Sequence, residues 1–174
     1  MVTGCAGFIG FHVTKKLLEQ DFYVLGIDNL NNYYSTKLKK KRLDILREFT
    51  KFNFSKVDMS NFTKLNNVLK KQKFDYIFHF AAQAGVRHSL KKPKDYLDSN
   101  IIGYFNLLEI IKLKKIKHLI LASTSSIYGE SKKKIFQESD KSDFPIQFYA
   151  ATKKTNEVIS YSYSHIYNLP ITAT

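Results

Sequence analysis

The stretch TGCAGFIG at residues 3–10 decides the fold of this 174-residue chain. It spaces Gly4, Gly7 and Gly10 evenly between the stub of an apolar strand and a segment of helical period. Without Cβ atoms, glycines let the backbone turn tightly, approach a pyrophosphate and pack a helix against a sheet, while the helix N-terminus favours the phosphate charge. The spacing predicts a dinucleotide-binding loop, and a tight strand-to-helix turn without a ligand is the alternative.

Two acidic residues strengthen the prediction of a dinucleotide. Asp28 ends the next apolar run, where a carboxylate can accept hydrogen bonds from both hydroxyls of an adenosine ribose and repel a 2′-phosphate. This favours NAD over NADP, although an Asp can also simply start a turn with Asn29. Asp58 follows the third apolar run and can meet the adenine amino group, or it belongs to the N-cap region of the next helix.

Short apolar runs alternate with longer segments of helical period along the whole chain. This pattern predicts an α/β fold of the Rossmann type, a doubly wound parallel sheet, in a single domain. We expect strands at 1–3, 22–27, 52–57, 75–80, 118–122 and 171–174. We expect helices at 11–20, 38–48, 61–71, 95–113 and 147–167, with Pro170 closing the last helix.

The net charge of +13 raises the question of nucleic-acid binding. The basic residues lie in separate segments, 37–42, 112–117 and 132–134, which fit solvated faces of helices and loops, so we expect no nucleic-acid partner. No apolar run is long enough to cross a membrane, and the single Cys5 fits a reducing compartment, so we expect a cytoplasmic protein without a membrane partner. The histidines form no cluster with Cys5, and no metal is expected.

A candidate catalytic pair lies towards the C-terminal end of the sequence. Tyr149 and Lys153 are one helical turn apart and share one face of the predicted helix. A nearby ammonium stabilises a phenolate and lowers a pKa that is otherwise about 10, so that tyrosine can act as a base at neutral pH. Thr124 follows the fifth apolar run, and its hydroxyl can bind the same substrate oxygen. We expect the three side chains to converge on one alcohol.

These motifs, in this order, resemble the extended short-chain dehydrogenase/reductase family of NAD-dependent epimerases and dehydratases, and most of all its UDP-glucuronate 4-epimerase branch. The resemblance spans essentially the whole chain. It rests on TGCAGFIG (3–10), GIDNLNNYY (26–34), HFAAQAGVRHSL (79–90), DSNIIGYFNLLE (98–109), STSSIYG (123–129), YAATKKTNE (149–157) and YSHIYNLPIT (163–172).

The resemblance implies NAD as the cofactor and a role for each matching residue. It places Gly4, Gly7 and Gly10 at the pyrophosphate, Asp28 at the adenosine ribose, Asp58 and Met59 at the adenine, Ala81, Ala82 and Gln83 along the cofactor, and Asn100 near the nicotinamide. In the active site it implies that Tyr149 is the base, that Lys153 binds the nicotinamide ribose and tunes Tyr149, and that Thr124 is the usual Ser/Thr.

The implied reaction is epimerisation at C4 of a UDP-sugar substrate, from UDP-glucuronate to UDP-galacturonate. Tyr149 takes the proton of the sugar 4-hydroxyl while a hydride passes to NAD, and the 4-keto sugar turns over before hydride and proton return. A UDP-glucuronate decarboxylase, a UDP-glucose 4-epimerase and a non-catalytic NAD-binding fragment are the alternatives.

Two local features bear on the reaction. Relatives that dehydrate nucleotide sugars carry an Asp-Glu pair directly after the threonine, where this chain has Ser125 and Ser126, so dehydration is disfavoured. Arg87 offers a fork for a carboxylate or phosphate, although it is equally well a surface residue on a loop. Arg87 and Ser125 are the candidate substrate contacts.

The resemblance also bears on domains and partners. Family members have more strand residues before TGCAGFIG and about as much chain again after the sixth strand, which forms a smaller domain over the sugar nucleotide. We therefore expect residues 1–174 to be the NAD-binding domain, truncated within the sixth strand and without the C-terminal substrate-binding domain. Such a chain is expected to bind NAD weakly and to turn over little substrate. A homodimer through the helices carrying Asn100 and Tyr149 is implied by the resemblance alone.

Overall fold

The computed structural model describes residues 1–130, 133 and 135–174. Residues 131, 132 and 134, and with them most of the basic segment expected at 132–134, lie outside the described residues. Within the described part of the chain, no helix is long and apolar enough to span a membrane.

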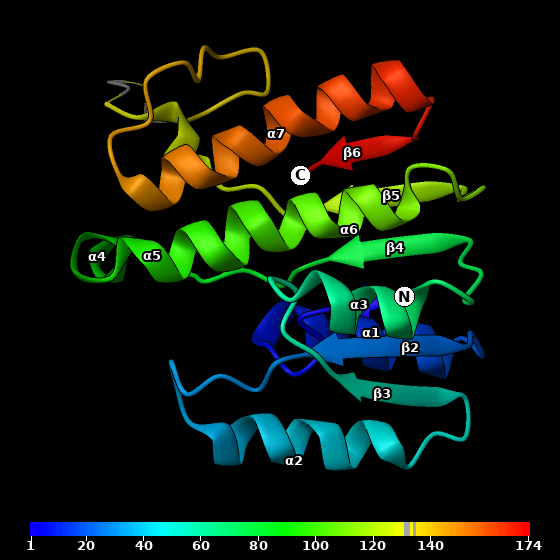
Figure 1. Ribbon diagram of the computed structural model, residues 1–174. Helices are drawn as coiled ribbons and strands as arrows, with labels where there is room; N and C mark the ends of the chain where they lie inside the picture. Colours follow the sequence, from blue (N-terminus) through cyan, green and yellow to red (C-terminus); the bar gives the residue numbers. More distant parts are fainter. Residues whose placement is uncertain (131–132, 134) are drawn as a thin grey trace.

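A six-stranded parallel sheet forms the centre of the molecule (Figure 1). Its strands are β1 (Val2–Thr3), β2 (Val24–Asp28), β3 (Phe52–Lys56), β4 (Tyr76–His79), β5 (His118–Leu121) and β6 (Ile171–Ala173). The order across the sheet is β3-β2-β1-β4-β5-β6, and every neighbouring pair is parallel. The chain therefore winds outwards from β1 in one direction and from β4 in the other, and α/β sheets bind ligands at such a reversal. The predicted Rossmann-type, doubly wound sheet is confirmed.

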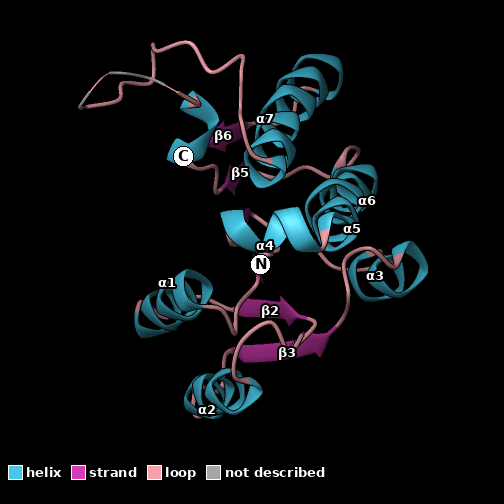
Figure 2. Ribbon diagram, turned by 90° about the vertical axis from the view of Figure 1, so that its left-hand side faces the viewer, coloured by secondary structure: helices cyan, strands magenta, loops and turns pink. Residues whose placement is uncertain are grey.

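Helices cover both faces of this sheet (Figure 2). On one face lie α1 (Phe8–Glu19) and α2 (Thr36–Arg47). On the other lie α3 (Phe62–Leu69), α6 (Gly103–Ile111) and α7 (Phe148–Tyr167). Three-layer packing of this kind buries the inner strands on both sides, which is why β2, β4 and β5 are mostly apolar, whereas the edge strand β3 (FNFSK) is partly exposed.

Each face of the sheet has its own apolar core. Phe11 of α1 and Leu43 of α2 belong to one core, and Leu107 of α6 belongs to the other. Side chains alternate along the strands, so Ile77 of β4 packs into the α6 side while its neighbour Phe78 packs against the α1 side. The two cores hold the strand ends at which the candidate site lies.

The helix expected at 95–113 is built in three parts. A short helix, α5 (Pro93–Tyr96), leads into a π-helical stretch, η1 (Leu97–Ile102), which continues as α6. π-Turns are rare and frequent at functional sites, but apolar spacing does not distinguish them from α-helix. The sequence analysis also missed two short helices, α4 (Val86–Lys91) and the 3-10 helix η2 (Ser125–Tyr128), which are too short to show a period.

The end of α7 has a different cause from the one expected. Asn168 takes the left-handed conformation, with φ 54° and ψ 35°, directly after Tyr167. Asparagine tolerates this region better than most residues, and helices commonly end there. Pro170 follows, and its carbonyl oxygen accepts a hydrogen bond from the Leu119 backbone at 2.8 Å, which aligns β6 beside β5. The expectation that Pro170 closes the helix is therefore wrong.

The left-handed Asn168 yields a prediction about stability. The Asn168→Ala variant should lower the free energy of unfolding by about 1 kcal/mol, because alanine meets a steric penalty in this conformation. Asn168→Gly should leave stability unchanged or raise it, because glycine has no such penalty. Urea denaturation followed by circular dichroism measures both, and an equal loss in the two variants would contradict this account of the helix end.

Candidate cofactor pocket and active site

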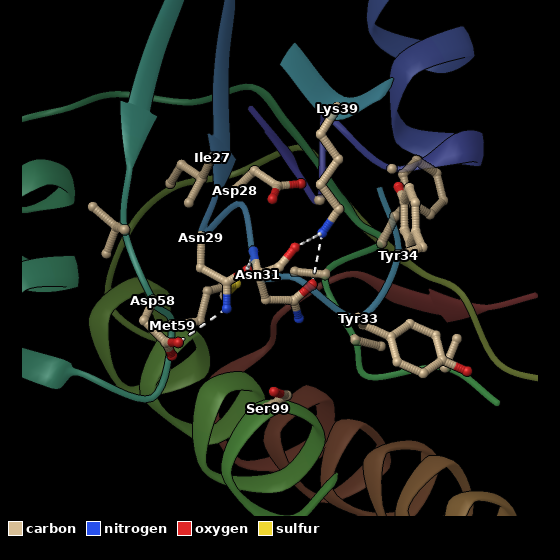
Figure 3. Close-up of a pocket in the computed structure, with 17 residues that line it drawn as sticks. Ile27, Asp28, Asn29, Asn31, Tyr33, Tyr34, Lys39, Asp58, Met59 and Ser99 are labelled. Carbon is tan, nitrogen blue, oxygen red and sulfur yellow. Dashed lines mark hydrogen bonds between the residues drawn. The ribbon is translucent and has the colours of Figure 1, made fainter. Parts of the chain in front are cut away.

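A pocket opens at the carboxyl ends of the strands, where β1 lies between β2 and β4 (Figure 3). Its walls come from the segments that follow β1, β2, β3 and β4. Lys39 of α2 and Ser99 of η1 complete it from the two helical layers. This is the reversal point of a doubly wound sheet, the place where a dinucleotide is expected.

The glycine loop is shaped by contacts between backbones. Gly4 has a positive φ of 70°, and a Cβ on it would lie 2.8 Å from the Ala81 nitrogen. A Cβ on Gly10 would lie 2.1 Å from the Gly4 carbonyl oxygen, so α1 packs directly on the turn. Gly7 is the N-cap of α1 and lines the pocket. The loop thus brings a helix N-terminus to the pocket, the arrangement that suits a phosphate.

Asp28 stands at the end of β2 in the pocket wall and is largely buried. Its Oδ2 accepts a hydrogen bond from the Ala6 nitrogen at 3.1 Å, and its Oδ1 accepts one from the Leu30 nitrogen at 2.8 Å. The second bond closes the turn at Asn29, so the turn that was the alternative interpretation is present as well. Each carboxylate oxygen can accept about two hydrogen bonds, and each keeps capacity for a ligand.

Asp58 follows β3 and lines the same pocket with Met59. It accepts hydrogen bonds from the Asn29 side chain at 2.9 Å and from the Ser60 hydroxyl at 2.6 Å. Burial alone would raise the pKa of Asp58, but the hydrogen bonds from Ser60 and Asn29 outweigh it and lower the pKa. Asn61 caps α3 through its own side chain, so Asp58 does not serve as that cap.

The segment after β4 passes Ala81 and Ala82 along the pocket. Asn100, fully buried on η1, holds this segment in place. Its Oδ1 accepts from the Gln83 nitrogen at 2.7 Å, and its Nδ2 donates to the Gln83 carbonyl at 3.2 Å and to the Thr152 hydroxyl at 2.9 Å. Asn100 therefore joins the pocket wall to α7, and its amide is largely used by the protein itself.

The structure brings the Tyr149 and Thr124 hydroxyls together. Thr124 precedes η2, where its Oγ1 accepts a hydrogen bond from the Ser126 nitrogen at 3.2 Å. Tyr149 lies in the first turn of α7, with its ring edge-on to Tyr96 at 6.1 Å. Burial raises the pKa of Tyr149, and the hydrogen bond from Thr124 lowers it in part.

Lys153 follows one turn later on α7 and is almost completely buried. Burial lowers the pKa of its ammonium to about 8, against an opposing effect of Glu157. Its charge acts on His79, whose pKa falls to about 3 through burial and through Lys153. Burial outweighs the hydrogen bond from Thr124, so the pKa of Tyr149 is raised in this structure, and a lowering of that pKa by Lys153 stays a prediction.

A buried polar cluster, not foreseen from the sequence, surrounds Lys153. The Nδ1 atom of His79 shares a hydrogen bond of 2.8 Å with the Thr3 hydroxyl. Its Nε2 atom and both amide atoms of Asn156 are buried without a hydrogen-bond partner among the described residues. Such groups normally find a partner in ordered water or a ligand.

A family model described as GDP-mannose 4,6 dehydratase matches residues 1–174. The chain belongs to this family. Protein CapI of Staphylococcus aureus is 46% identical over 172 residues, covering 99% of this chain and 51% of that protein. The UDP-glucuronate 4-epimerase of Thermodesulfobacterium geofontis is 48% identical over 172 residues, covering 98% of this chain and 53% of that protein.

Solved structures agree with these relatives of the GDP-mannose 4,6 dehydratase family. The UDP-glucuronic acid 4-epimerase from Bacillus cereus, in complex with UDP-glucuronic acid and NAD, superposes with a TM-score of 0.88 at 33% identity. The match covers 99% of this chain and 54% of the Bacillus cereus chain. The resemblance to nucleotide-sugar epimerases is confirmed, and the chain spans about half the length of the relatives that it matches.

The two candidate substrate contacts lie outside the pocket of Figure 3. Arg87 lies on α4, which packs against α7, and its side chain has no hydrogen bond or ion pair among the described residues. Ser125 is exposed at the start of η2, beside Thr124. Both residues lie on elements that pack against α7, the helix that carries Tyr149, and their roles stay predictions.

Lys39 is a pocket residue that the sequence analysis missed. It was assigned with the basic segment 37–42 to a solvated face, but it is buried and lines the pocket. A signal was present, since Lys39 shares the buried face of α2 with Leu43 and Leu46 at helical spacing. The charge of Lys39 led to its assignment to the solvated face despite this spacing.

Burial of Lys153 yields a prediction about pH and stability. A base with a depressed pKa in the folded state destabilises folding while it is charged, and this cost shrinks as pH rises from about 8 to 10.5. Lys153→Met should therefore raise the free energy of unfolding at pH 7 by roughly 3 kcal/mol, at about 1.4 kcal/mol per pKa unit. The gain should diminish towards pH 10.

The matched control for this prediction is Lys115→Met, which removes an equal charge from an exposed position. Urea unfolding at pH 7 and pH 10 should show little change in the control at either pH. A loss of stability at pH 7 in Lys153→Met would contradict the cost assigned to the buried ammonium.

Proposed function

We propose that this chain is the NAD-binding domain of a nucleotide-sugar 4-epimerase that converts UDP-glucuronate to UDP-galacturonate. The observation that carries the proposal is the placement of Thr124 directly before η2 and of Tyr149 in the first turn of α7, where their side chains interact, with buried Lys153 one turn along α7. A pure binding module has no need to hold these three groups together beside a dinucleotide loop. The names of relatives that share about half their length with this chain support the same reaction.

The residues present fit NAD. The turn at Gly4 and the N-terminus of α1 suit the pyrophosphate, and Asp28 retains acceptor capacity for the ribose hydroxyls. Asp58 and Met59 line the part of the pocket assigned to the adenine, and Ala81 and Ala82 line the wall that follows β4. Bound NAD would supply a reversible hydride acceptor, and the remaining chemistry belongs to the protein.

In this proposal Tyr149 moves the proton. Its phenolate accepts the proton of the sugar 4-hydroxyl and returns it to the same oxygen after the sugar has turned over. Thr124 donates a hydrogen bond at this point, which stabilises the phenolate and orients the alcohol. The buried Lys153 binds the nicotinamide ribose. Asn100 holds the 81–83 segment against α7 through its hydrogen bonds to Gln83 and Thr152.

Epimerisation is favoured over dehydration by the residues that follow Thr124. Elimination of water needs an acid and a base next to the sugar, and here Ser125 and Ser126 occupy those places at the start of η2. A hydroxyl is a poor acid at neutral pH. Ser125 and Arg87 serve instead as substrate contacts, with Arg87 offered to the carboxylate or a phosphate of the sugar nucleotide.

The proposal includes the surroundings of the site. We place residues 1–174 as the NAD-binding domain, with a separate domain covering the sugar nucleotide, because the relatives are about twice as long as the match. A cytoplasmic location accords with Cys5, which is buried and free and whose thiol pKa is raised by burial. The product would serve polysaccharide biosynthesis.

The test of the catalytic assignment uses the protein that carries this chain, incubated with NAD and UDP-glucuronate. Tyr149→Phe should reduce formation of UDP-galacturonate by about a thousandfold, since it removes the group that transfers the proton. Tyr161→Phe, an exposed tyrosine on the same helix, should keep full activity. Chromatography of the product formed from UDP-glucuronate separates a 4-epimerase from a decarboxylase, which would release a UDP-pentose, and UDP-glucose as a second substrate tests for a UDP-glucose 4-epimerase. Full activity in Tyr149→Phe would remove Tyr149 from the mechanism.

A homodimer through the helices that carry Asn100 and Tyr149 is part of the proposal. Exposed apolar side chains on these helices support it, namely Leu97, Ile102 and Phe105 on one and Val158 and Ile166 on the other. Burying such side chains against a second copy is favourable at roughly 25 cal/mol per Å². Phe105→Glu should shift the protein from dimer to monomer in sedimentation velocity, whereas Phe22→Glu, exposed elsewhere, should not. A monomeric wild-type protein would reject the dimer.

A further inference from the structure

Lys39 is buried in the wall of the pocket, and no carboxylate among the described residues forms an ion pair with its ammonium (Figure 3). Lysine is almost never fully buried unless it has a partner. Its Nζ donates to the Asn31 carbonyl oxygen at 3.0 Å and to the Asn31 side-chain oxygen at 2.7 Å. An ammonium has three donors, and among the described residues the third has no acceptor. One hydrogen-bond donor is thus left at the pocket wall.

Asp28 supplies acceptors in the same pocket. Its two oxygens are each bound by one backbone nitrogen, from Ala6 and from Leu30, and each can accept a further hydrogen bond. Its charge acts on Lys39 and raises the pKa of that ammonium, against a larger lowering by burial, although no ion pair joins the two. Asp28 and Lys39 therefore remain separate and leave two acceptors and one donor in one pocket.

This set of groups matches a vicinal diol. The two hydroxyl hydrogens of a diol can go to the two carboxylate oxygens, and one hydroxyl oxygen can accept from the ammonium. A carboxylate alone selects only for donors, whereas the added ammonium also requires an acceptor. Arg42 is not a lining residue of this pocket, and its Nη1 donates to the Ala6 carbonyl and to the Tyr34 hydroxyl.

We propose that Lys39 is a cofactor-binding residue that donates a hydrogen bond to one hydroxyl oxygen of the adenosine ribose, completing with Asp28 the recognition of the diol. The inference rests on the proposed function only in taking NAD as the ligand. It does not depend on the sugar or on turnover.

A purely structural role for Lys39 is the rival account. Its bonds to Asn31 hold the 29–34 segment, and its Nζ lies 4.6 Å from the centre of the Tyr34 ring. Under this account, loss of Lys39 weakens the binding of any ligand because the 29–34 segment loosens. The two roles differ in one respect: only the direct contact depends on a ribose hydroxyl.

The experiment measures binding of NAD and of its 2′-deoxyadenosine and 3′-deoxyadenosine analogues by calorimetry, in the wild-type protein and in Lys39→Met. Lys40→Met, which removes the same charge from an exposed position of α2, is the control. Lys39→Met should weaken the affinity for NAD roughly tenfold to a hundredfold, the range for a hydrogen bond to a charged group. Lys40→Met should change this affinity by less than about twofold.

The analogues decide between the two roles. For the analogue that lacks the contacted hydroxyl, wild type and Lys39→Met should bind equally well within about twofold, because the partner of Lys39 is already missing. An equal weakening of NAD and of both analogues by Lys39→Met overturns the proposal in favour of the structural role. Absence of NAD binding by the wild-type protein overturns it as well. Failure of epimerase turnover with intact NAD binding rejects the proposed function alone.

Discussion

The contact between the Gly4 carbonyl and the first turn of α1 is the constraint on which the rest of the structure depends. There is no room for a side chain between them, since a Cβ on Gly10 would lie 2.1 Å from that oxygen. The same turn meets the backbone of Phe80 and Ala81 on its other side. Because three pieces of backbone touch at this point, the end of β1, the start of α1 and the end of β4 cannot move independently.

The sequence predicted the fold and most of the pocket for a definite reason. Apolar runs buried on both faces and a glycine loop at the first strand are features of local composition, and Asp28 and Asp58 sit where strands end. Features that depend on three-dimensional packing were missed. The π-helical stretch around Asn100 has no distinct apolar spacing. Lys39 has the same charge as its exposed neighbour Lys40, and only its helical spacing to Leu43 and Leu46 distinguishes it in the sequence. The effect of Lys153 on the pKa of His79 joins two residues that are distant in sequence.

A row of polar residues lies along the buried face of α7, where it lowers stability but keeps the interior behind Tyr149 polar. Lys153, Asn156 and Ser160 follow one another at helical spacing, all buried. Ser160 meets the Tyr104 hydroxyl at 2.6 Å, and the Tyr104 ring lies on His79 with centroids 4.9 Å apart. Apolar residues at these positions would pack with less desolvation cost. Retaining them keeps the interior behind Tyr149 polar, which suits a site that moves charge.

The place of β1 in the sheet also bears on how the chain reaches this structure. β1 is the first strand in the sequence and one of the two central strands in the sheet, and the Met1 ammonium donates to the Tyr76 carbonyl across a separation of 75 residues. Closing a loop of that length is slow compared with pairing β2 and β3, which are joined by α2 alone. On a ribosome, the N-terminal segment must remain with one edge unpaired until β4 has emerged. The two sides of the pocket, which follow β1 and β4, therefore come together late in folding. Ligand binding thus requires that β4 has paired with β1, and not only that β1, β2 and β3 have formed.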